Sequence, residues 1–143
     1  MHQEVMQLLG ISEREISRIP LDREREFYAM AFALYEQGDY LSASGIFTQL
    51  VLTSPFSEHY WRGLASCKQM AEDFRAALHA WSLVCLLSEK DPLPHFYAAG
   101  CLLSLQEKEE ALKALDAALE RCTEQTLREK IQLLKQIHYA HKD

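Results

Sequence analysis

The sequence lacks any run of about 18 or more apolar residues, so no segment is predicted to span or insert into a membrane. Its first residues, Met1 to Val5, also lack the basic start and apolar centre of a signal peptide. Basic residues are in the minority, since 15 Lys and Arg face 21 Asp and Glu and give a formal net charge of −6. Because nucleic-acid binding depends on a basic surface, we expect a protein that binds no nucleic acid.

Cysteine pairs of the Cys-x-x-Cys type are absent, and no Cys/His cluster has the spacing of a zinc site. His138 and His141 lie three residues apart, but no third ligand is evident, so no metal site is predicted. We interpret the cysteines as reduced thiols that serve as small apolar residues, which fits a reducing compartment. These cysteines are Cys67, Cys85, Cys101 and Cys122.

The signatures of catalytic sites are also missing. The sequence contains no Gly-rich phosphate loop, no Gly-x-Ser-x-Gly motif and no paired carboxylates in a recognisable setting. The charged run around Lys108 is typical of a solvated turn. We therefore predict that the protein is not an enzyme and needs no cofactor.

A pattern of small and large residues repeats every 34 positions. An apolar helical stretch ends at Gly38-Asp39, and a second one begins at Tyr40, as expected for two helices joined by a tight turn. The same size classes return one and two periods later, which is the signature of a helical repeat. The clearest columns are Ala31/Ala65/Ala99, Ala43/Ala77/Ala111, Phe47/Trp81/Leu115 and Leu50/Val84/Ala118.

The period divides the chain into units within one domain covering residues 1–143. We expect repeats at 24–57, 58–91 and 92–125, preceded by an N-terminal helical segment over 1–21. A capping helix is predicted over 126–140, because the last repeat of a stack needs a cover. Its apolar stripe consists of Leu127, Ile131, Leu134 and Ile137.

The column pattern resembles that of the tetratricopeptide repeat. The first repeat matches nearly every column, whereas Glu72 and Gln106 replace the turn glycine in the other two. The resemblance implies an all-α fold: a right-handed superhelix of three helix pairs, with a concave groove lined mainly by the first helix of each pair.

First-helix residues that point away from the core columns should line this groove. Several are aromatic, which favours a binding surface, although these rings could instead pack under the N-terminal segment. The candidate groove residues are Tyr28, Phe32, Tyr35, Glu36, His59, Arg62, Ser66, Gln69, Met70, Leu93, Phe96, Gly100 and Leu103.

A closer resemblance covers about residues 27–122. The blocks 35–40, 61–69 and 91–102 look like those of the class II chaperones of bacterial type III secretion systems. The most specific spacings are Gly-Leu-x-x-Cys-x-Gln from Gly63 and Pro-x-x-x-x-Ala-x-Cys-Leu from Pro94 in the third repeat. The resemblance implies a cytoplasmic protein that holds an extended segment of a hydrophobic translocator protein in its groove and keeps it soluble. It also implies a possible homodimer through the N-terminal segment.

Two other binding functions stay open on the sequence. A generic tetratricopeptide scaffold would bind another peptide, but the groove of the first repeat offers Tyr28, Phe32 and Tyr35 rather than groups suited to carboxylate capture. A chaperone for a needle subunit would bind an amphipathic helix rather than an extended strand.

Overall fold

The computed structural model describes residues 20–139, and the sequence-based expectations for residues 1–19 and 140–143 lie outside this range. The described part contains seven α-helices, one short 3-10 turn and no strand, so the predicted all-α fold class is confirmed. The elements are η2 (Leu21–Arg23), α2 (Glu24–Glu36), α3 (Tyr40–Thr53), α4 (Glu58–Met70), α5 (Phe74–Leu87), α6 (Pro92–Ser104), α7 (Lys108–Arg121) and α8 (Gln125–Tyr139).

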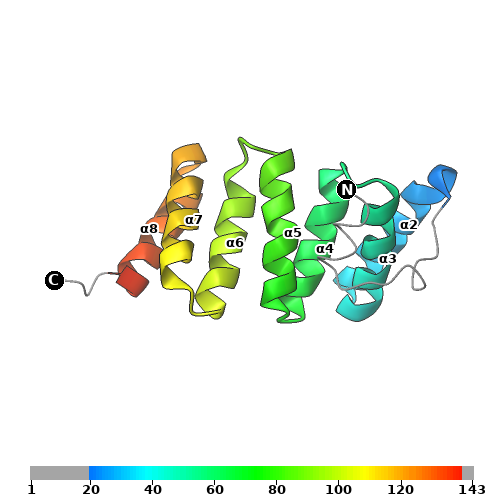
Figure 1. Cartoon of the computed structure of the whole chain (residues 1–143), viewed down its shortest axis with the longest axis horizontal. Coiled ribbons are helices and arrows are strands. Elements are labelled where there is room, and N and C mark those ends of the chain that lie inside the picture. The colour runs from blue at the N-terminus through cyan, green and yellow to red at the C-terminus, as the bar shows by residue number, and fades with distance from the viewer. Residues whose placement is uncertain (1–19, 140–143) are drawn as a thin grey trace.

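The helices follow one another along the long axis of the molecule in chain order, from α2 at one end to α8 at the other (Figure 1). Each consecutive pair of helices is in contact, both within a hairpin and between hairpins. We call α2, α4 and α6 the first helices and α3, α5 and α7 the second helices. Because neighbours in sequence are neighbours in space, the fold is built from local contacts, as in other repeat proteins.

Aspartates begin several of the helices. The side chain of Asp39 accepts a hydrogen bond from the backbone N–H of Ser42 at 3.2 Å, and Asp73 caps α5 in the same way. At α6, Asp91 accepts from the N–H of Leu93 at 2.9 Å, and Pro92 occupies the first turn, where its missing N–H leaves no bond unmade. These side chains satisfy backbone N–H groups that the first turn of a helix leaves without a partner, and so fix where each helix begins.

The turn inside each hairpin has one residue in the left-handed backbone region. Only the first of these residues is glycine, which has no Cβ to oppose a positive φ. In every hairpin the backbone N–H of the following residue reaches back to a carbonyl of the first helix, for example from Asp39 to Leu34 at 3.0 Å. The left-handed residues are Gly38 (φ 84°), Glu72 (φ 62°) and Gln106 (φ 61°).

Small and large residues alternate in the core as the 34-residue period predicts. Ala43, Ala77 and Ala111 are fully buried and let the two helices of a pair approach closely. One turn later in the second helices, a large side chain fills the space beside each alanine. These side chains, Phe47, Trp81 and Leu115, are also buried.

The column pattern does not carry over to the ends of the stack. Met30 is 50% exposed, although Leu64 and Ala98 in the same column are buried. In the described residues only the short η2 turn precedes α2, so no earlier α-helix packs on α2 there. At the other end Ile131 is fully buried, but Ile137, the last member of the predicted α8 stripe, is 57% exposed.

Both tryptophans are buried and hydrogen-bonded at different places along the stack. The indole Nε1–H of Trp61 donates to the backbone carbonyl of Pro55 at 2.8 Å. Trp81 donates to Oε1 of Gln69, also at 2.8 Å. Each bond satisfies a donor that burial would otherwise leave without a partner.

Candidate functional site

Three aromatic side chains form a row along one face of α2. The ring centroids of Tyr28 and Phe32 are 6.3 Å apart, and those of Phe32 and Tyr35 are 6.5 Å apart. Phe32 is 47% exposed, whereas the two tyrosines are half-buried. The row therefore presents aromatic surface to solvent and is not sealed inside the core.

Other aromatic rings support this row from behind. Tyr28 meets the buried ring of Phe47 edge-on, with 6.0 Å between centroids, and Tyr60 at 5.6 Å. Burial raises the pKa of the Tyr60 hydroxyl, and the nearby Glu24 carboxylate raises it further. Burial also raises the pKa of Tyr35, with a contribution from Tyr40. Both phenols stay protonated at neutral pH and can donate hydrogen bonds.

A cavity of about 220 Å³ opens between α2 and α4, beside the aromatic row. Six of the sequence-predicted groove residues meet here, three from each of these two helices. Phe47 and Gly63 also line the cavity and were not predicted. The lining residues are Tyr28, Phe32, Tyr35, Phe47, His59, Arg62, Gly63 and Ser66.

Gly63 could have been recognised from the sequence. It lies in the interior of α4, where glycine costs about 1 kcal/mol relative to alanine and usually has a packing reason. The reason here is Phe47: a Cβ at position 63 would overlap the ring of Phe47. Only glycine at position 63 allows the Phe47 ring to pack directly against α4.

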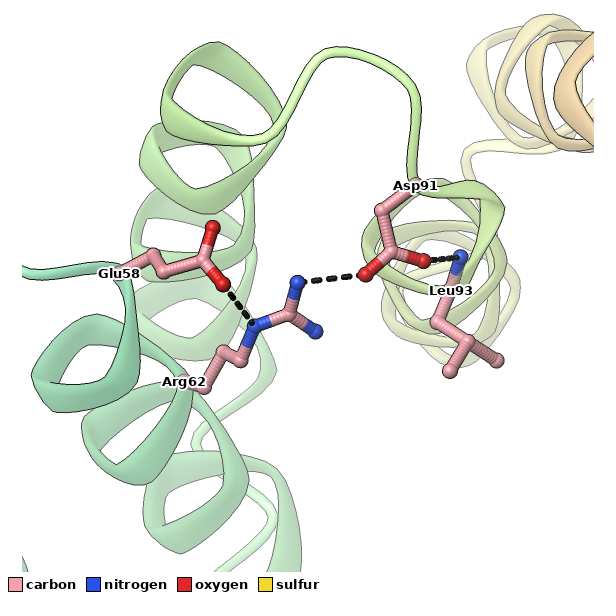
Figure 2. A network of polar contacts seen from close by, with 4 residues as sticks. All are labelled: Glu58, Arg62, Asp91 and Leu93. Atoms are coloured by element: carbon pink, nitrogen blue, oxygen red, sulfur yellow. Dashed lines mark hydrogen bonds and ion pairs between the residues drawn. The ribbon is translucent and has the colours of Figure 1, made fainter.

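Arg62 crosses from α4 to the first turn of α6 and binds two carboxylates (Figure 2). Its Nε lies 3.6 Å from Oε1 of Glu58, and its Nη2 lies 2.5 Å from Oδ2 of Asp91. The other carboxylate oxygen of Asp91 accepts the N–H of Leu93 that caps α6. The guanidinium is therefore held in place between two carboxylates, whose combined negative charge exceeds its own.

The side-chain amide of Gln69, near the end of α4, has a fixed orientation. Because Oε1 of Gln69 accepts the indole N–H of Trp81, its Nε2 points the other way, toward Gly100. A Cβ added at Gly100 would lie 3.6 Å from this Nε2, which is an ordinary contact. Space therefore exists at Gly100 that does not exist at Gly63.

The remaining predicted residues lie apart from the 220 Å³ cavity. Leu93 lines a second cavity, of about 240 Å³, between the start of α6 and α8. Phe96 packs against the buried cluster that contains Ile131 of α8. Five other candidates line neither cavity: Glu36, Gln69, Met70, Gly100 and Leu103.

The buried thiols do not form a reactive site. Burial raises the pKa of Cys67 and of Cys101 to about 11, so both stay protonated at neutral pH. All four cysteines are free. Within residues 20–139 no group of three or more His, Cys, Asp or Glu side chains could hold a metal ion, and none of the helices could cross a membrane.

No family model matches the chain. The chain is 30% identical over 111 residues to the low calcium response locus protein H of Yersinia pestis; the match covers 78% of this chain and 66% of that protein, about two thirds of its length.

Two solved structures of similar proteins share the fold over their whole length. The type III secretion chaperone SycD of Yersinia enterocolitica, in complex with a peptide of the translocator YopD, superposes with a TM-score of 0.81 at 26% identity. This match covers 89% of this chain and 100% of SycD. PcrH in complex with the chaperone-binding region of PopD gives a TM-score of 0.80 at 25% identity, covering 90% and 100% of the two chains.

These similarities agree with the family that the sequence blocks suggest and with the all-α fold of the structure. The chain belongs to the translocator chaperones of type III secretion systems.

Proposed function

We propose that this chain is a cytoplasmic secretion chaperone that binds an extended segment of a hydrophobic translocator protein along its first helices. Binding keeps the translocator soluble and apart from other copies until export. The solved relatives with a translocator peptide or chaperone-binding region support this proposal. The role is one of binding and not of catalysis, so screens for hydrolase and transferase activity should be negative.

The observation that carries the proposal is the cavity beside the aromatic row of α2. Its 220 Å³ is below the range of about 300–1,000 Å³ typical of small-molecule sites. A cavity of this size has room for one side chain of a bound segment. The solved relatives in complex with a translocator peptide favour a translocator client over a needle subunit.

The client's own chemistry explains why such a face is useful. A translocator exposes apolar segments that associate in water. A row of rings can cover one such segment, and the formal charge of −6 on the chaperone keeps the complex dispersed.

Co-expression with each hydrophobic translocator of the same organism tests the proposal. We expect the wild-type chain to move its client from the insoluble to the soluble fraction. Phe32→Ala should weaken client binding about tenfold or more, because it removes a large exposed ring from the row. Helicity should be unchanged.

Leu86→Ala is the matched control, since Leu86 is a large apolar residue 72% exposed on the second helix α5. Client binding should not change in this variant. An unchanged soluble fraction of every translocator in the presence of the wild-type chain would refute the proposed function.

A further inference from the structure

Two candidate groove residues that line neither cavity, Gln69 and Gly100, occupy repeat positions that do line one in the preceding repeat. Gln69 follows Tyr35 by 34 residues, and Gly100 follows Ser66 by the same interval. Tyr35 and Ser66 both line the cavity between α2 and α4. Gln69 of α4 and Gly100 of α6 are therefore the equivalent pair at the next junction, with an amide in place of a ring and no side chain in place of a hydroxyl.

The direction of the Gln69 amide is set by its partner. An indole N–H can only donate, so the amide atom that lies 2.8 Å from Nε1 of Trp81 is the oxygen. The indole is itself held in place, because Trp81 is 3% exposed and Tyr97 stacks on it with 4.9 Å between ring centroids and 29° between planes. The NH2 group of Gln69 consequently has a fixed direction, toward Gly100.

This NH2 group has no acceptor of its own. Within residues 20–139 no oxygen accepts a hydrogen bond from Nε2 of Gln69, whose one side-chain bond is made through Oε1. Among the same residues the only buried side-chain nitrogen or oxygen without a partner is Oε1 of Gln49, so Nε2 of Gln69 is open to solvent. Two oriented donors that face solvent can bind an external acceptor at little cost in side-chain entropy.

Gly100 is not explained by packing within the chain. It lies in the interior of α6, where glycine is less favourable than alanine. The nearest described atom to an added Cβ is Nε2 of Gln69, at an ordinary 3.6 Å. Gly45 of α3 also has room for a Cβ, but nothing described lies within 4 Å of that point, so no polar group accompanies it. Only Gly100 combines free space with an oriented donor, and glycine is suited to places where another backbone approaches closely.

The missing side chain distinguishes two kinds of acceptor. A carboxylate or amide on a client side chain could reach Nε2 of Gln69 from a distance, and would not need glycine beside it. A backbone carbonyl reaches it only if the bound main chain lies against the surface of α6, which a side chain at position 100 would prevent.

We infer that Gln69 and Gly100 together recognise the backbone of the bound segment. The amide N–H of Gln69 donates to one backbone carbonyl of the client at the point where its main chain crosses Gly100. The contact positions the segment at the junction of the second and third repeats without selecting the client side chain there. This inference rests on the proposed function, since it assigns a role to two residues of the same face.

Overlapping synthetic peptides that cover a co-expressed translocator are the probe, tested against the full chain. Gln69→Glu keeps an oxygen for the indole of Trp81 but replaces the NH2 group with a second oxygen. It should weaken binding of the bound peptide about tenfold or more, because the client carbonyl then faces an acceptor. The indole N–H of Trp81 should stay protected from hydrogen exchange. Gln132→Glu, which adds the same charge at an exposed position of α8, is the control and should leave the affinity unchanged.

Gly100→Ala tests the approach of the main chain. It should weaken peptide binding about tenfold, although the free chain should be at least as stable as the wild type. Gly45→Ala is the matched control, since it also replaces a helical glycine that has room for a Cβ. Its affinity for the peptide should equal that of the wild-type chain.

Single ester bonds in place of the amides of the peptide locate the carbonyl. An ester carbonyl accepts hydrogen bonds more weakly than an amide carbonyl does. One ester position should weaken binding to the wild-type chain several-fold and have a clearly smaller effect on binding to Gln69→Glu. Each ester also removes a peptide N–H, but that loss affects both chains alike, so the difference between them reports the carbonyl.

The two proposals fail in different ways. If the wild-type chain neither solubilises a translocator nor binds any peptide, the proposed function is wrong and the inference falls with it. If folded Gln69→Glu and Gly100→Ala bind the peptide as tightly as the wild-type chain does, only the inference is overturned. An ester scan in which no position depends on Gln69 would likewise overturn the backbone contact and leave the proposed function standing.

Discussion

Arg62 of α4 and Asp91 at the start of α6 form an ion pair across the junction of the second and third repeats, with 2.5 Å between Nη2 and Oδ2. The same carboxylate caps α6 through Leu93. The pair therefore connects a residue of the candidate groove to the beginning of the next repeat, and its loss should affect stability as well as the binding face.

Arg62→Met should lower the free energy of unfolding by about 1 kcal/mol, because both side chains are only about a quarter exposed. Asp91→Asn keeps a side-chain oxygen that can cap α6, so its effect on stability reports the contribution of the ion pair with Arg62 alone. Urea unfolding of both variants and of the double variant gives the coupling between the two residues. Strictly additive losses would mean that the pair contributes nothing to stability.

The left-handed turns give a second prediction. Glu72→Gly and Gln106→Gly should each stabilise the protein by about 1 kcal/mol, since glycine has no Cβ to oppose the positive φ. Gly38→Ala should destabilise it by a similar amount. Thermal unfolding measures all three, and a lower melting temperature for both glycine variants would contradict the account of these turns.

Two glycines of the first helices should respond in opposite ways to alanine. Gly63→Ala should cost about 1–3 kcal/mol, because the new Cβ forces the buried Phe47 ring to move. Gly100→Ala should be neutral or stabilise by up to about 1 kcal/mol, since its Cβ has room and alanine favours the helix. Equal effects of the two changes on chemical unfolding would show that packing on Phe47 does not distinguish them.

The buried thiols predict an alkaline loss of stability. The pKa of Cys67 and of Cys101 is about 11 in the folded chain, mainly because burial disfavours the thiolate, against about 9 when unfolded. The unfolded chain therefore loses these protons first. The stabilisation is complete below about pH 9 and is lost as the pH rises toward 11.

Urea unfolding at several pH values between about 8 and 11 measures this decline. The double variant Cys67→Ala, Cys101→Ala should be less stable overall because of the small cavities that it creates. Its stability should nevertheless fall less steeply with pH than that of the wild-type chain. An equally steep fall would assign the alkaline loss to other groups.

The sequence predicted those features that repeat. Ala43, Ala77 and Ala111 could be assigned to the core because a small residue returns every 34 positions beside a large one, and all three are buried. The pattern could not show the exposure of Met30, because a column records what a position needs between two neighbouring repeats, and within residues 20–139 no repeat precedes the one that contains Met30.

Parts of the candidate site were predicted less well. The aromatic row from Tyr28 to Tyr35 followed from the repeat columns together with the groove that the tetratricopeptide resemblance implies. A glycine inside a helix could have marked position 63, but its partner Phe47 depends on how two repeats meet, which no spacing within one helix encodes. Whether these residues bind a client stays a prediction.

The two buried, hydrogen-bonded indoles described above are intrinsic fluorescent probes of the helical stack. Trp61 reports on the connection between α3 and α4 around Pro55, and Trp81 reports on the packing of Tyr97 and Gln69. Replacing one or the other with phenylalanine leaves a single emitter in a known place. Fluorescence of the two variants during unfolding would then show whether the halves of the molecule separate together or in sequence, without any added dye.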